Sequence, residues 1–370
     1  MQDTNVIKVL QFPLANSKGG MARYELNNWK WIDKTRFHFD FVSFSDHIDF
    51  DEEILATGAK IFYMKNYAEI NPKGFEEELK KILKNGYDIV HLHTNMWGSL
   101  LAEKVVMDAG INKIIIHSHS TSIFGKKNIQ DIQKLHDYNK KLITDKIATD
   151  FWACSQEAAE WLYGDKISKE KIKIMPNAIE SFRFKYDEKT RKEYRESLCI
   201  DDKFVLGCVA NFIYQKNHDF LVDLMQEMGP DTVLLLVGSG PLKERVMKKV
   251  DELGLTEKII FLGYRNDSDK LYQCMDVVLL PSIAEAFPYV TVEAQVSGVQ
   301  CLVSDNVTTQ VDFTSNICHE ELIKDKWIEK ILELKKKVFT EKRISWDHAC
   351  KEKGLDYESA IQLLEKEYSR

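Results

Sequence analysis

The sequence lacks the features that mark secreted, membrane-spanning and zinc-binding proteins. Its seven cysteines are odd in number and none forms a C-x-x-C pair, so neither a disulfide framework nor a zinc site is predicted. No apolar run approaches the roughly 18 residues that cross a bilayer. The opening residues, MQDTNVIKVL, lack the basic start and the apolar run of a secretory signal. We therefore expect reduced thiols and a cytoplasmic location.

An excess of positive charge is also missing. The formal net charge is −7, which gives no reason to expect nucleic acid as a partner. Apolar residues make up 44% and charged residues 29% of the chain, a balance typical of globular proteins. At roughly 100–200 residues per domain, 370 residues predict two domains, with enough apolar material for two cores.

Short apolar runs alternate with longer amphipathic segments along most of the chain. The segment FEEELKKILKNG, which ends on a glycine, is typical of the helices that separate the runs. The alternation predicts an α/β protein with doubly wound parallel sheets. The expected strands are residues 6–12, 39–44, 60–64, 88–93, 113–119 and 150–155, then 204–210, 232–238, 258–263, 277–282 and 299–305.

The alternation pauses at the charged stretch KYDEKTRKEYRESL, so we place a domain boundary near residue 182. The expected domains are residues 1–182 and 183–349, both Rossmann-like. The tail, about residues 350–370, is predicted to be a helix that follows no further strand and packs back on the first domain. Ligands of open α/β sheets bind beyond the carboxyl ends of strands, so the residues after each strand are the candidates for a site.

The most informative of these segments is LLPSIAEAFPYVTVEAQVSG. A helix is expected to begin near Pro288, because proline is favoured at the first helical position. The amides of Tyr289 and Val290 would then suit a diphosphate. Glu285 before the helix and Glu293 inside it could accept hydrogen bonds from vicinal hydroxyls of a sugar and a ribose. The alternative is a helix whose acidic residues only complement its dipole.

Three further loops follow predicted strands and could face a ligand. Lys216 lies in the turn of CVANFIYQKNHDFLVDL, where its ammonium could reach phosphate oxygens, although a single lysine is more often solvated. Gly238 and Gly240 would let a ligand approach the backbone, although a tight turn explains them equally well. Gly19 and Gly20 follow the first strand and predict a flexible loop, but they do not form the G-x-G-x-x-G dinucleotide fingerprint.

Two histidine pairs near strand ends raise the question of a metal. His91 with His93, and His117 with His119, are alternate residues, so each pair faces one side of its sheet. No acidic or cysteine partner stands nearby with ligand spacing, so no metal is predicted. His119, in HSHSTS, is the histidine best placed to meet a ligand hydroxyl.

A metal that bridges a phosphate-bearing ligand usually calls for paired aspartates. Asp49 and Asp51 have D-x-D spacing but lie in an acidic loop. Asp267 and Asp269 have the same spacing, and we interpret them as a helix cap. Neither pair follows a strand directly, so neither predicts a metal site.

Taken together and in this order, these segments resemble the GT-B-fold retaining glycosyltransferases of family 4, in particular bacterial exopolysaccharide and capsule enzymes. The resemblance runs over nearly the whole chain and includes GGMARYELNNWKWID, HSHSTS, KIMPNAIE, YQKN, VGSGPL and LGYRND. Its most specific part is the pair Glu285 and Glu293 in the context PS…E…P…EA…G.

The resemblance implies transfer of a hexose or N-acetylhexosamine from a nucleotide sugar, more often a UDP-sugar, to a glycan or polyprenyl-linked acceptor. It implies no cofactor, no metal and no protein nucleophile. Lys216 would neutralise the diphosphate, Glu285 would contact sugar hydroxyls, and His119 would contact the sugar from the first domain. Glu293 would hold the ribose. The implied donor site comprises Gly19, Gly20, Asn211, Lys216, Gly238, Gly240, Tyr264, Arg265, Glu285, Pro288, Tyr289, Val290 and Glu293.

Two residues depart from the family pattern. Asn211 stands where an arginine commonly precedes the lysine, so one phosphate-facing charge is missing. Ala286 stands where a glycine commonly follows the first glutamate, and its methyl group restricts the loop. Both departures favour a second hypothesis, a non-catalytic partner of an active transferase. A third, a nucleotide-sugar epimerase of the same fold, would need further acid/base carboxylates, and no clear set is present.

Two basic segments of the first domain raise the question of a membrane surface. They are NNWKWIDKTRFHF and GKKNIQDIQKLHDYNKKLITDK. If they share a face, they could rest on anionic lipid of the inner membrane, which would suit a polyprenyl-linked acceptor. The alternative is a solvated helix face.

Overall fold

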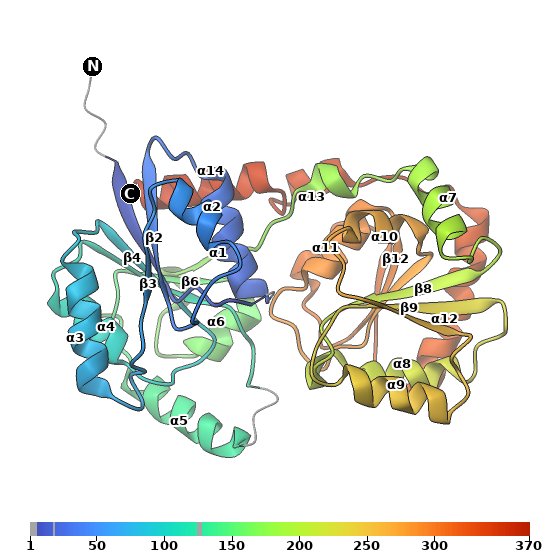
Figure 1. The fold of residues 1–370 in the computed structure, drawn as a ribbon, viewed down its shortest axis with the longest axis horizontal. Coiled ribbons are helices and arrows are strands. Elements are labelled where there is room, and N and C mark those ends of the chain that lie inside the picture. Colours follow the sequence, from blue (N-terminus) through green and yellow to red (C-terminus); the bar gives the residue numbers. More distant parts are fainter. Residues whose placement is uncertain (1–5, 18, 124–127) are drawn as a thin grey trace. The chain divides into compact units, whose positions relative to one another are not determined.

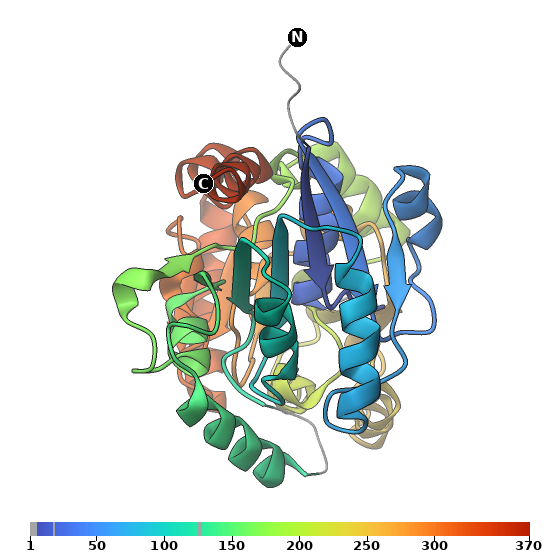
Figure 2. The ribbon, with the colours of Figure 1, turned by 90° about the vertical axis from the view of Figure 1, so that its left-hand side faces the viewer.

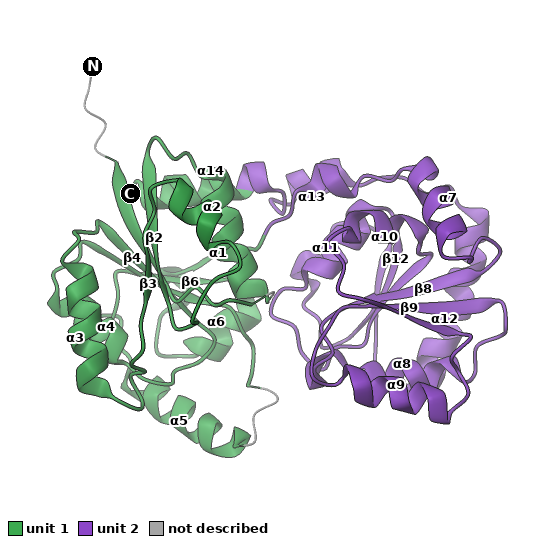
Figure 3. Cartoon of the chain, viewed as in Figure 1, with its two compact units in different colours: residues 1–177, 360–370 green, residues 178–359 purple. Residues whose placement is uncertain are grey.

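A computed structural model describes residues 6–17, 19–123 and 128–370 (Figures 1 and 2). The chain divides into two compact units, which we describe separately (Figure 3). Unit 1 comprises residues 1–177 together with 360–370, and unit 2 comprises residues 178–359. Within the described part of the chain, no helix has the length and apolar character needed to cross a bilayer.

Unit 1 is built on a seven-stranded sheet in the order β3-β2-β1-β4-β5-β6-β7, with every neighbouring pair parallel. The winding reverses between β1 and β4, which are paired at the centre of the sheet. The strands are β1 (Ile7–Phe12), β2 (Phe37–Ser43), β3 (Ile61–Tyr63), β4 (Ile89–Thr94), β5 (Lys113–Ser118), β6 (Asp150–Ala153) and β7 (Ile172–Ile174).

Helices follow the strands of unit 1 in the expected alternation. Their starts have local causes: Asn71 and Ser155 cap α3 and α6 by accepting hydrogen bonds from backbone amides of the first turn. The helices are α1 (Gly20–Trp31), α2 (Asp51–Ala56), α3 (Pro72–Leu83), α4 (Leu101–Asp108), α5 (Ile129–Leu142) and α6 (Gln156–Leu162), with a short 3₁₀ turn at Lys169–Lys171.

The end of the chain completes the core of unit 1. Helix α14 (Tyr357–Tyr368) contributes Ile361, Leu364 and Tyr368 to a buried cluster with the central strands and with α1 and α2. Its backbone and side chains are also tied to the sheet: the Lys113 ammonium donates to the Glu367 carbonyl at 2.5 Å. The predicted single tail helix is in fact two helices, since α13 (Asp347–Glu352) ends before Gly354.

Unit 2 repeats the plan with a six-stranded parallel sheet in the order β10-β9-β8-β11-β12-β13. The winding reverses between β8 and β11. The strands are β8 (Phe204–Val209), β9 (Thr232–Val237), β10 (Ile259–Gly263), β11 (Val277–Leu280), β12 (Gln300–Ser304) and β13 (Ile317–Glu320).

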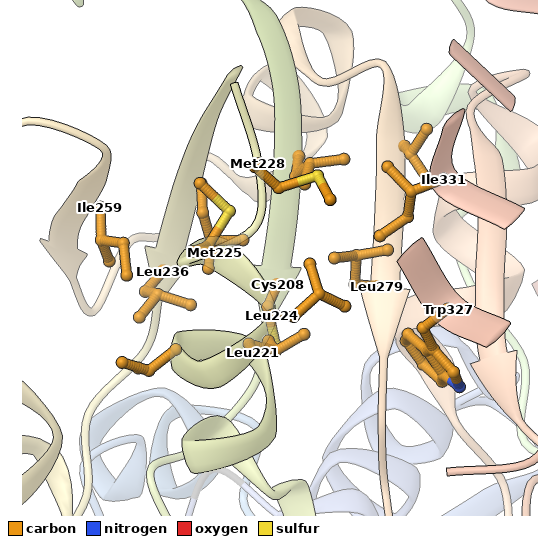
Figure 4. Close-up of a cluster of buried hydrophobic side chains, with 14 of the residues drawn as sticks. Cys208, Leu221, Leu224, Met225, Met228, Leu236, Ile259, Leu279, Trp327 and Ile331 are labelled. Atoms are coloured by element: carbon orange, nitrogen blue, oxygen red, sulfur yellow. The ribbon is translucent and has the colours of Figure 1, made fainter. Parts of the chain in front are cut away.

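Helices cover both faces of the unit 2 sheet, which is why its central strands are buried along their whole length. Figure 4 shows α8 packing Leu221 and Met225 against the sheet beside Trp327 of α12. The helices are α7 (Glu188–Ser197), α8 (His218–Met225), α9 (Lys243–Glu252), α10 (Ser268–Cys274), α11 (Tyr289–Val296), α12 (Lys324–Thr340) and α13, with 3₁₀ turns at Ser181–Phe184, Tyr214–Lys216 and Thr309–Val311.

The predicted fold class is therefore confirmed: both units are α/β with doubly wound parallel sheets. Two strands escaped prediction, β7 and β13. Both are short strands at a sheet edge, and none of their residues is fully buried, so neither forms a long apolar run. The expectation that the tail follows no further strand was wrong, because β13 intervenes after β12.

Two glycines that end helices test how tightly unit 2 is packed. Gly298 and Gly254 have φ of +71° and +65°, and a side chain at either position costs about 1–2 kcal/mol of conformational energy. A Cβ on Gly298 would lie 2.0 Å from the Ile344 carbonyl oxygen, whereas one on Gly254 meets nothing within 4 Å. We expect Gly298→Ala to lower the free energy of unfolding by roughly 1–3 kcal/mol more than Gly254→Ala, measured by urea unfolding. Equal losses would contradict the close approach of the 343–346 segment.

Candidate functional site

In unit 2 the loops that follow β8 and β11 leave from adjacent strands. The chain winds outward from β8 through β9 to β10, then returns to the other side of β8 as β11. A reversal of this kind leaves no crossover helix above the carboxyl ends of the two strands, which is where open α/β sheets bind ligands. The candidate residues of unit 2 are distributed over the four loops that follow β8, β9, β10 and β11.

The loop after β8 is held against the loop after β9 by backbone contacts. The Phe212 amide donates to the Ser239 carbonyl at 2.9 Å, and the Phe212 carbonyl accepts from the Leu242 amide at 3.0 Å. Gly240 has φ of +151°, and a Cβ on it would lie 2.7–2.9 Å from Phe212 backbone atoms. Gly238 approaches the Ala210 carbonyl in the same way. These glycines are required by the contact between the two loops.

Lys216 and Glu285 meet at the reversal of the winding. The Lys216 ammonium forms an ion pair with Glu285 Oε1, and the Ser282 hydroxyl donates to the same oxygen at 2.7 Å. The backbones of the two loops are joined as well, since the Ile283 amide donates to the Gln215 carbonyl at 2.8 Å. Side-chain exposure is 19% for Lys216 and 11% for Glu285, so both charges are largely shielded from water while remaining accessible.

Helix α11 begins directly after the Glu285 loop. Pro288, where the helix was predicted to begin, is its cap residue, and the helix begins one position later with Tyr289 and Val290 in its first turn. Glu293 lies farther along and is almost fully buried, and its Oε2 accepts a hydrogen bond from the Tyr272 hydroxyl at 2.8 Å. The structure thus brings Pro288, Tyr289 and Val290 to the same edge as Lys216, and anchors Glu293 from α10.

An arginine that the sequence did not single out adds positive charge here. Arg183, in the 3₁₀ turn at Ser181–Phe184, pairs with Glu180 at 2.8 Å and lies 3.6 Å from Asp269. The hydrogen bond that Arg183 donates to the Glu180 carboxylate raises the pKa of Arg183, with smaller contributions from Asp269 and Glu293. Its contact with Asp269 joins positions 86 residues apart, so no local pattern indicates it.

Tyr264 and Arg265 follow β10, which is separated from β8 by β9. Tyr264 is 46% exposed. The Arg265 guanidinium holds the Asp267 carboxylate through two hydrogen bonds, of 2.8 and 2.5 Å, and Tyr194 donates to the same carboxylate at 2.7 Å. Asp267 precedes α10 as expected for a cap, but its side chain makes no capping hydrogen bond. The cap interpretation of this D-x-D pair was therefore wrong in its chemistry.

Asn211, the first departure from the family pattern, lies in the turn directly after β8. Its carbonyl accepts from the Ile213 amide at 2.8 Å, and its side chain is half-buried. Ala286, the second departure, is half-buried in the loop between Glu285 and α11. Glu285 itself forms an isolated parallel bridge with Val307, which fixes the backbone of this loop.

Unit 1 carries the remaining candidates at the corresponding edge of its sheet. Gly19 is the cap residue of α1 and Gly20 its first residue, and residue 18 of the same loop lies outside the described part of the chain. His119 directly follows β5, and its amide donates to the Thr94 carbonyl at 3.0 Å. Burial lowers the pKa of His119 to about 3, so this imidazole is neutral at physiological pH.

The other three histidines are buried beside His119 on the same face of the sheet. Desolvation holds the pKa of His91, His93 and His117 well below the ordinary value. One ring nitrogen from each of the three lies within 4.8 Å of the other two, yet both nitrogens of His91 and of His93 are already hydrogen-bonded. Glu25 of α1 lies 3.9 Å from His93 Nε2, an acidic neighbour that sequence spacing did not reveal.

Comparison with known families and proteins gives a consistent result. Residues 190–354 match the family described as glycosyl transferases group 1. EpsF of Bacillus subtilis, which is named as a glycosyltransferase, is 31% identical over 313 residues, covering 82% of this chain and 81% of that protein. The Escherichia coli UDP-Gal:alpha-D-GlcNAc-diphosphoundecaprenol alpha-1,3-galactosyltransferase is 24% identical over 323 residues, covering 81% and 79%.

Solved structures show the same fold. Anabaena Alr3699/HepE in complex with UDP superposes with a TM-score of 0.78 at 18% identity, covering 99% of this chain and all of that one. A glycosyltransferase from Rickettsia africae gives a TM-score of 0.80 at 16% identity, covering 98% of each chain. The two Rossmann-like units are those of the GT-B fold.

The buried histidines make unit 1 sensitive to acid. A histidine whose pKa is depressed by folding binds its proton only in the unfolded chain. Each therefore removes about 1.4 kcal/mol of unfolding free energy per pH unit below roughly pH 6.5, and removes nothing above it. Between pH 6.5 and 5 we expect the free energy of unfolding of His117→Leu, measured by urea unfolding, to fall by about 1.4 kcal/mol less per pH unit than that of the wild type. Parallel pH profiles would contradict the buried, neutral state of His117.

Proposed function

The chain belongs to the group 1 glycosyltransferases, and from that premise we propose that it transfers a hexose or N-acetylhexosamine from a UDP-sugar to a glycan or lipid-linked acceptor in bacterial polysaccharide synthesis. The donor base is suggested by the UDP bound to Alr3699/HepE, and the acceptor class by the diphosphoundecaprenol named for the Escherichia coli relative. The exopolysaccharide and capsule enzymes that the sequence resembles support the same assignment.

The observation that carries the donor site is the pairing of Lys216 with Glu285 where the winding of unit 2 reverses. A diphosphate that binds at the start of α11 would compete with the Glu285 carboxylate for the Lys216 ammonium. The carboxylate would then be free to accept hydrogen bonds from hydroxyls of the sugar, while Ser282 keeps it in place. One ion pair would thus be exchanged for two contacts with the donor, one to each end of the reacting bond.

We assign Lys216 the stabilisation of the leaving diphosphate, the contribution expected to dominate in a transfer without a protein nucleophile. Such a front-face transfer retains the configuration of the donor sugar. Glu293 and Tyr272 hold each other in unit 2, and we assign Glu293 to the ribose. Anomeric proton couplings in the product test the stereochemistry, and a β-linked product from an α-linked donor would rule out retention.

We also propose that the reaction needs no metal ion or cofactor. The aspartates with D-x-D spacing are engaged elsewhere: Asp267 with Arg265 and Tyr194, and Asp49 with Asn16 at 3.0 Å. Lys216 supplies at the diphosphate the positive charge that a divalent cation would otherwise supply.

A thermal-shift titration with UDP tests the donor site. We expect UDP to stabilise the wild type equally with Mg²⁺ and with EDTA. Lys216→Ala should bind UDP roughly tenfold or more weakly than the wild type, because an ion pair to phosphate contributes about 1.5–3 kcal/mol. Lys335→Ala is the matched control. Lys335 also lies in unit 2 with a 23% exposed side chain and an acidic partner, Asp231, at 2.6 Å, but Asp231 precedes the amino end of β9.

The two variants separate a local effect from a general one. Equal losses in Lys216→Ala and Lys335→Ala would remove Lys216 from the donor site. Stabilisation that appears only with Mg²⁺ would overturn the metal-independent reaction. No stabilisation of the wild type by UDP would overturn the donor assignment itself.

A lipid-linked acceptor would place the enzyme on the cytoplasmic face of the membrane, and we propose that α5 makes the contact. Leu135, Tyr138 and Leu142 are exposed at i, i+3/i+4 spacing on this helix, with Lys134 and Lys141 beside them. Residues 125–127 of the same basic segment lie outside the described residues. Helix α1 is set apart from α5 within unit 1, so the two basic segments do not form one patch (Figures 1 and 2).

Flotation with vesicles tests this surface. We expect the wild type to float with vesicles containing phosphatidylglycerol more than with phosphatidylcholine alone, since each basic residue near an anionic surface contributes about 1 kcal/mol. Tyr138→Asp with Leu142→Asp should abolish the difference. Phe339→Asp, at an exposed aromatic of α12 in unit 2, should leave it intact. Equal flotation of all three proteins would exclude α5 as the contact.

A further inference from the structure

The buried histidines of unit 1 belong to a chain of hydrogen bonds that ends at His119. His93 Nδ1 lies 2.9 Å from His119 Nε2, and His93 Nε2 lies 2.7 Å from Gln11 Oε1. The Gln11 amide nitrogen donates to the Tyr368 hydroxyl at 3.0 Å. Gln11, His93 and Tyr368 are each at most 3% exposed, so solvent water cannot hydrogen-bond to these groups in place of the protein partners.

The side-chain carbonyl of Gln11 determines where each proton in this chain lies. A carbonyl oxygen only accepts, so His93 Nε2 must carry a proton. His93 is neutral, because burial holds its pKa well below the ordinary value, and its Nδ1 is therefore an acceptor. His119 must then donate from Nε2. What remains is His119 Nδ1, a bare lone pair that has no hydrogen-bond partner among the described residues.

A second branch holds the Gln11 amide in this orientation. The Tyr368 oxygen accepts from Gln11, and the Tyr368 hydroxyl lies 2.7 Å from His91 Nδ1, to which it can donate. His91 then donates from Nε2 to His117 Nδ1 at 3.2 Å. The tail helix α14 thus supplies the group that satisfies the amide end of Gln11. If the Gln11 amide were rotated by about 180°, the ring protons of His93 and His119 would each have to move to the other ring nitrogen, and His119 Nδ1 would become a donor.

We propose that Gln11 is a positioning residue that fixes the tautomer of His119, so that His119 Nδ1 accepts a hydrogen bond from a hydroxyl of the sugar. This inference rests on the proposed function and on the contact between His119 and the sugar that the family resemblance implies. It adds that the recognised group is a donor, such as a hydroxyl, and that residues on β1 and α14 impose the selection without touching the sugar.

The proton positions can be read directly by NMR on full-length protein labelled with ¹⁵N-histidine. Long-range ¹H–¹⁵N correlation spectra distinguish a protonated from a bare ring nitrogen. In the wild type at pH 7 we expect His119 and His93 both to be protonated on Nε2 and bare on Nδ1. A His119 protonated on Nδ1 would overturn the proposal.

Two substitutions separate positioning from packing. Gln11→Met keeps the length of the side chain but removes the carbonyl, so His93 and His119 should populate both tautomers. Tyr163→Phe removes a buried hydroxyl of unit 1 that is hydrogen-bonded to the carbonyls of Ile116 and Trp152, outside the Gln11–His93–His119 chain, so the tautomer of His119 should persist. A His119 spectrum unchanged in Gln11→Met would overturn the role of Gln11, as would equal disturbance in both variants.

Binding provides a readout that a purely structural role would not move. The probes are UDP and whichever of UDP-glucose, UDP-galactose and UDP-N-acetylglucosamine stabilises the wild type most. Gln11→Met should weaken the UDP-sugar roughly three- to tenfold relative to UDP, the range expected for one neutral hydrogen bond. Equal weakening of both probes would overturn the contact with the sugar. Failure of UDP to bind the wild type would count against the proposed function, while the tautomer spectra would still decide the role of Gln11.

Discussion

Parallel pairing of strands is the constraint on which both units depend. Because every strand pair is parallel, all loops that follow strands in one unit leave from a single edge of its sheet. The reversal of winding then decides which of these loops become neighbours. In unit 2 it makes neighbours of the loops after β8 and β11, so Lys216 and Glu285 meet although 69 positions separate them. The charges are brought together by topology, and the hydrogen bond between Ile283 and Gln215 closes the arrangement.

Much of this fold could be predicted because long apolar runs are a direct consequence of strands buried on both faces. That signal fails at the sheet edges, where β7 and β13 are short and only half-buried. It fails again in the tail, where Gly354, with φ of +77°, lies between α13 and α14. The loops that carry candidate residues could be predicted from strand ends, as for Lys216, Glu285 and His119.

The partners of those residues could not be predicted, and the reason is physical. Periodicity indicates which face a side chain occupies, not what lies opposite. The partnership of Glu293 with Tyr272, like that of His93 with Gln11, depends on how elements pack across the sheet or between neighbouring helices. Buried polar groups need hydrogen-bond partners, and for Glu293 and His93 those partners lie on other elements of the fold. The loops after the strands of unit 2 therefore carry shielded charges, whereas the corresponding edge of unit 1 carries neutral imidazoles.

The core of unit 1 contains residues from both ends of the numbering: Val9 and Tyr368 belong to one buried cluster. Unit 2, by contrast, is a single stretch of chain. A ribosome that synthesises the protein from its amino end therefore releases all of unit 2 before it releases the last piece of unit 1. Until α14 is synthesised, the apolar surface of unit 1 that this helix covers stays exposed. Exposed apolar surface of this kind binds chaperones and promotes aggregation. Unit 1 is thus the first unit to begin synthesis and the last to be completed.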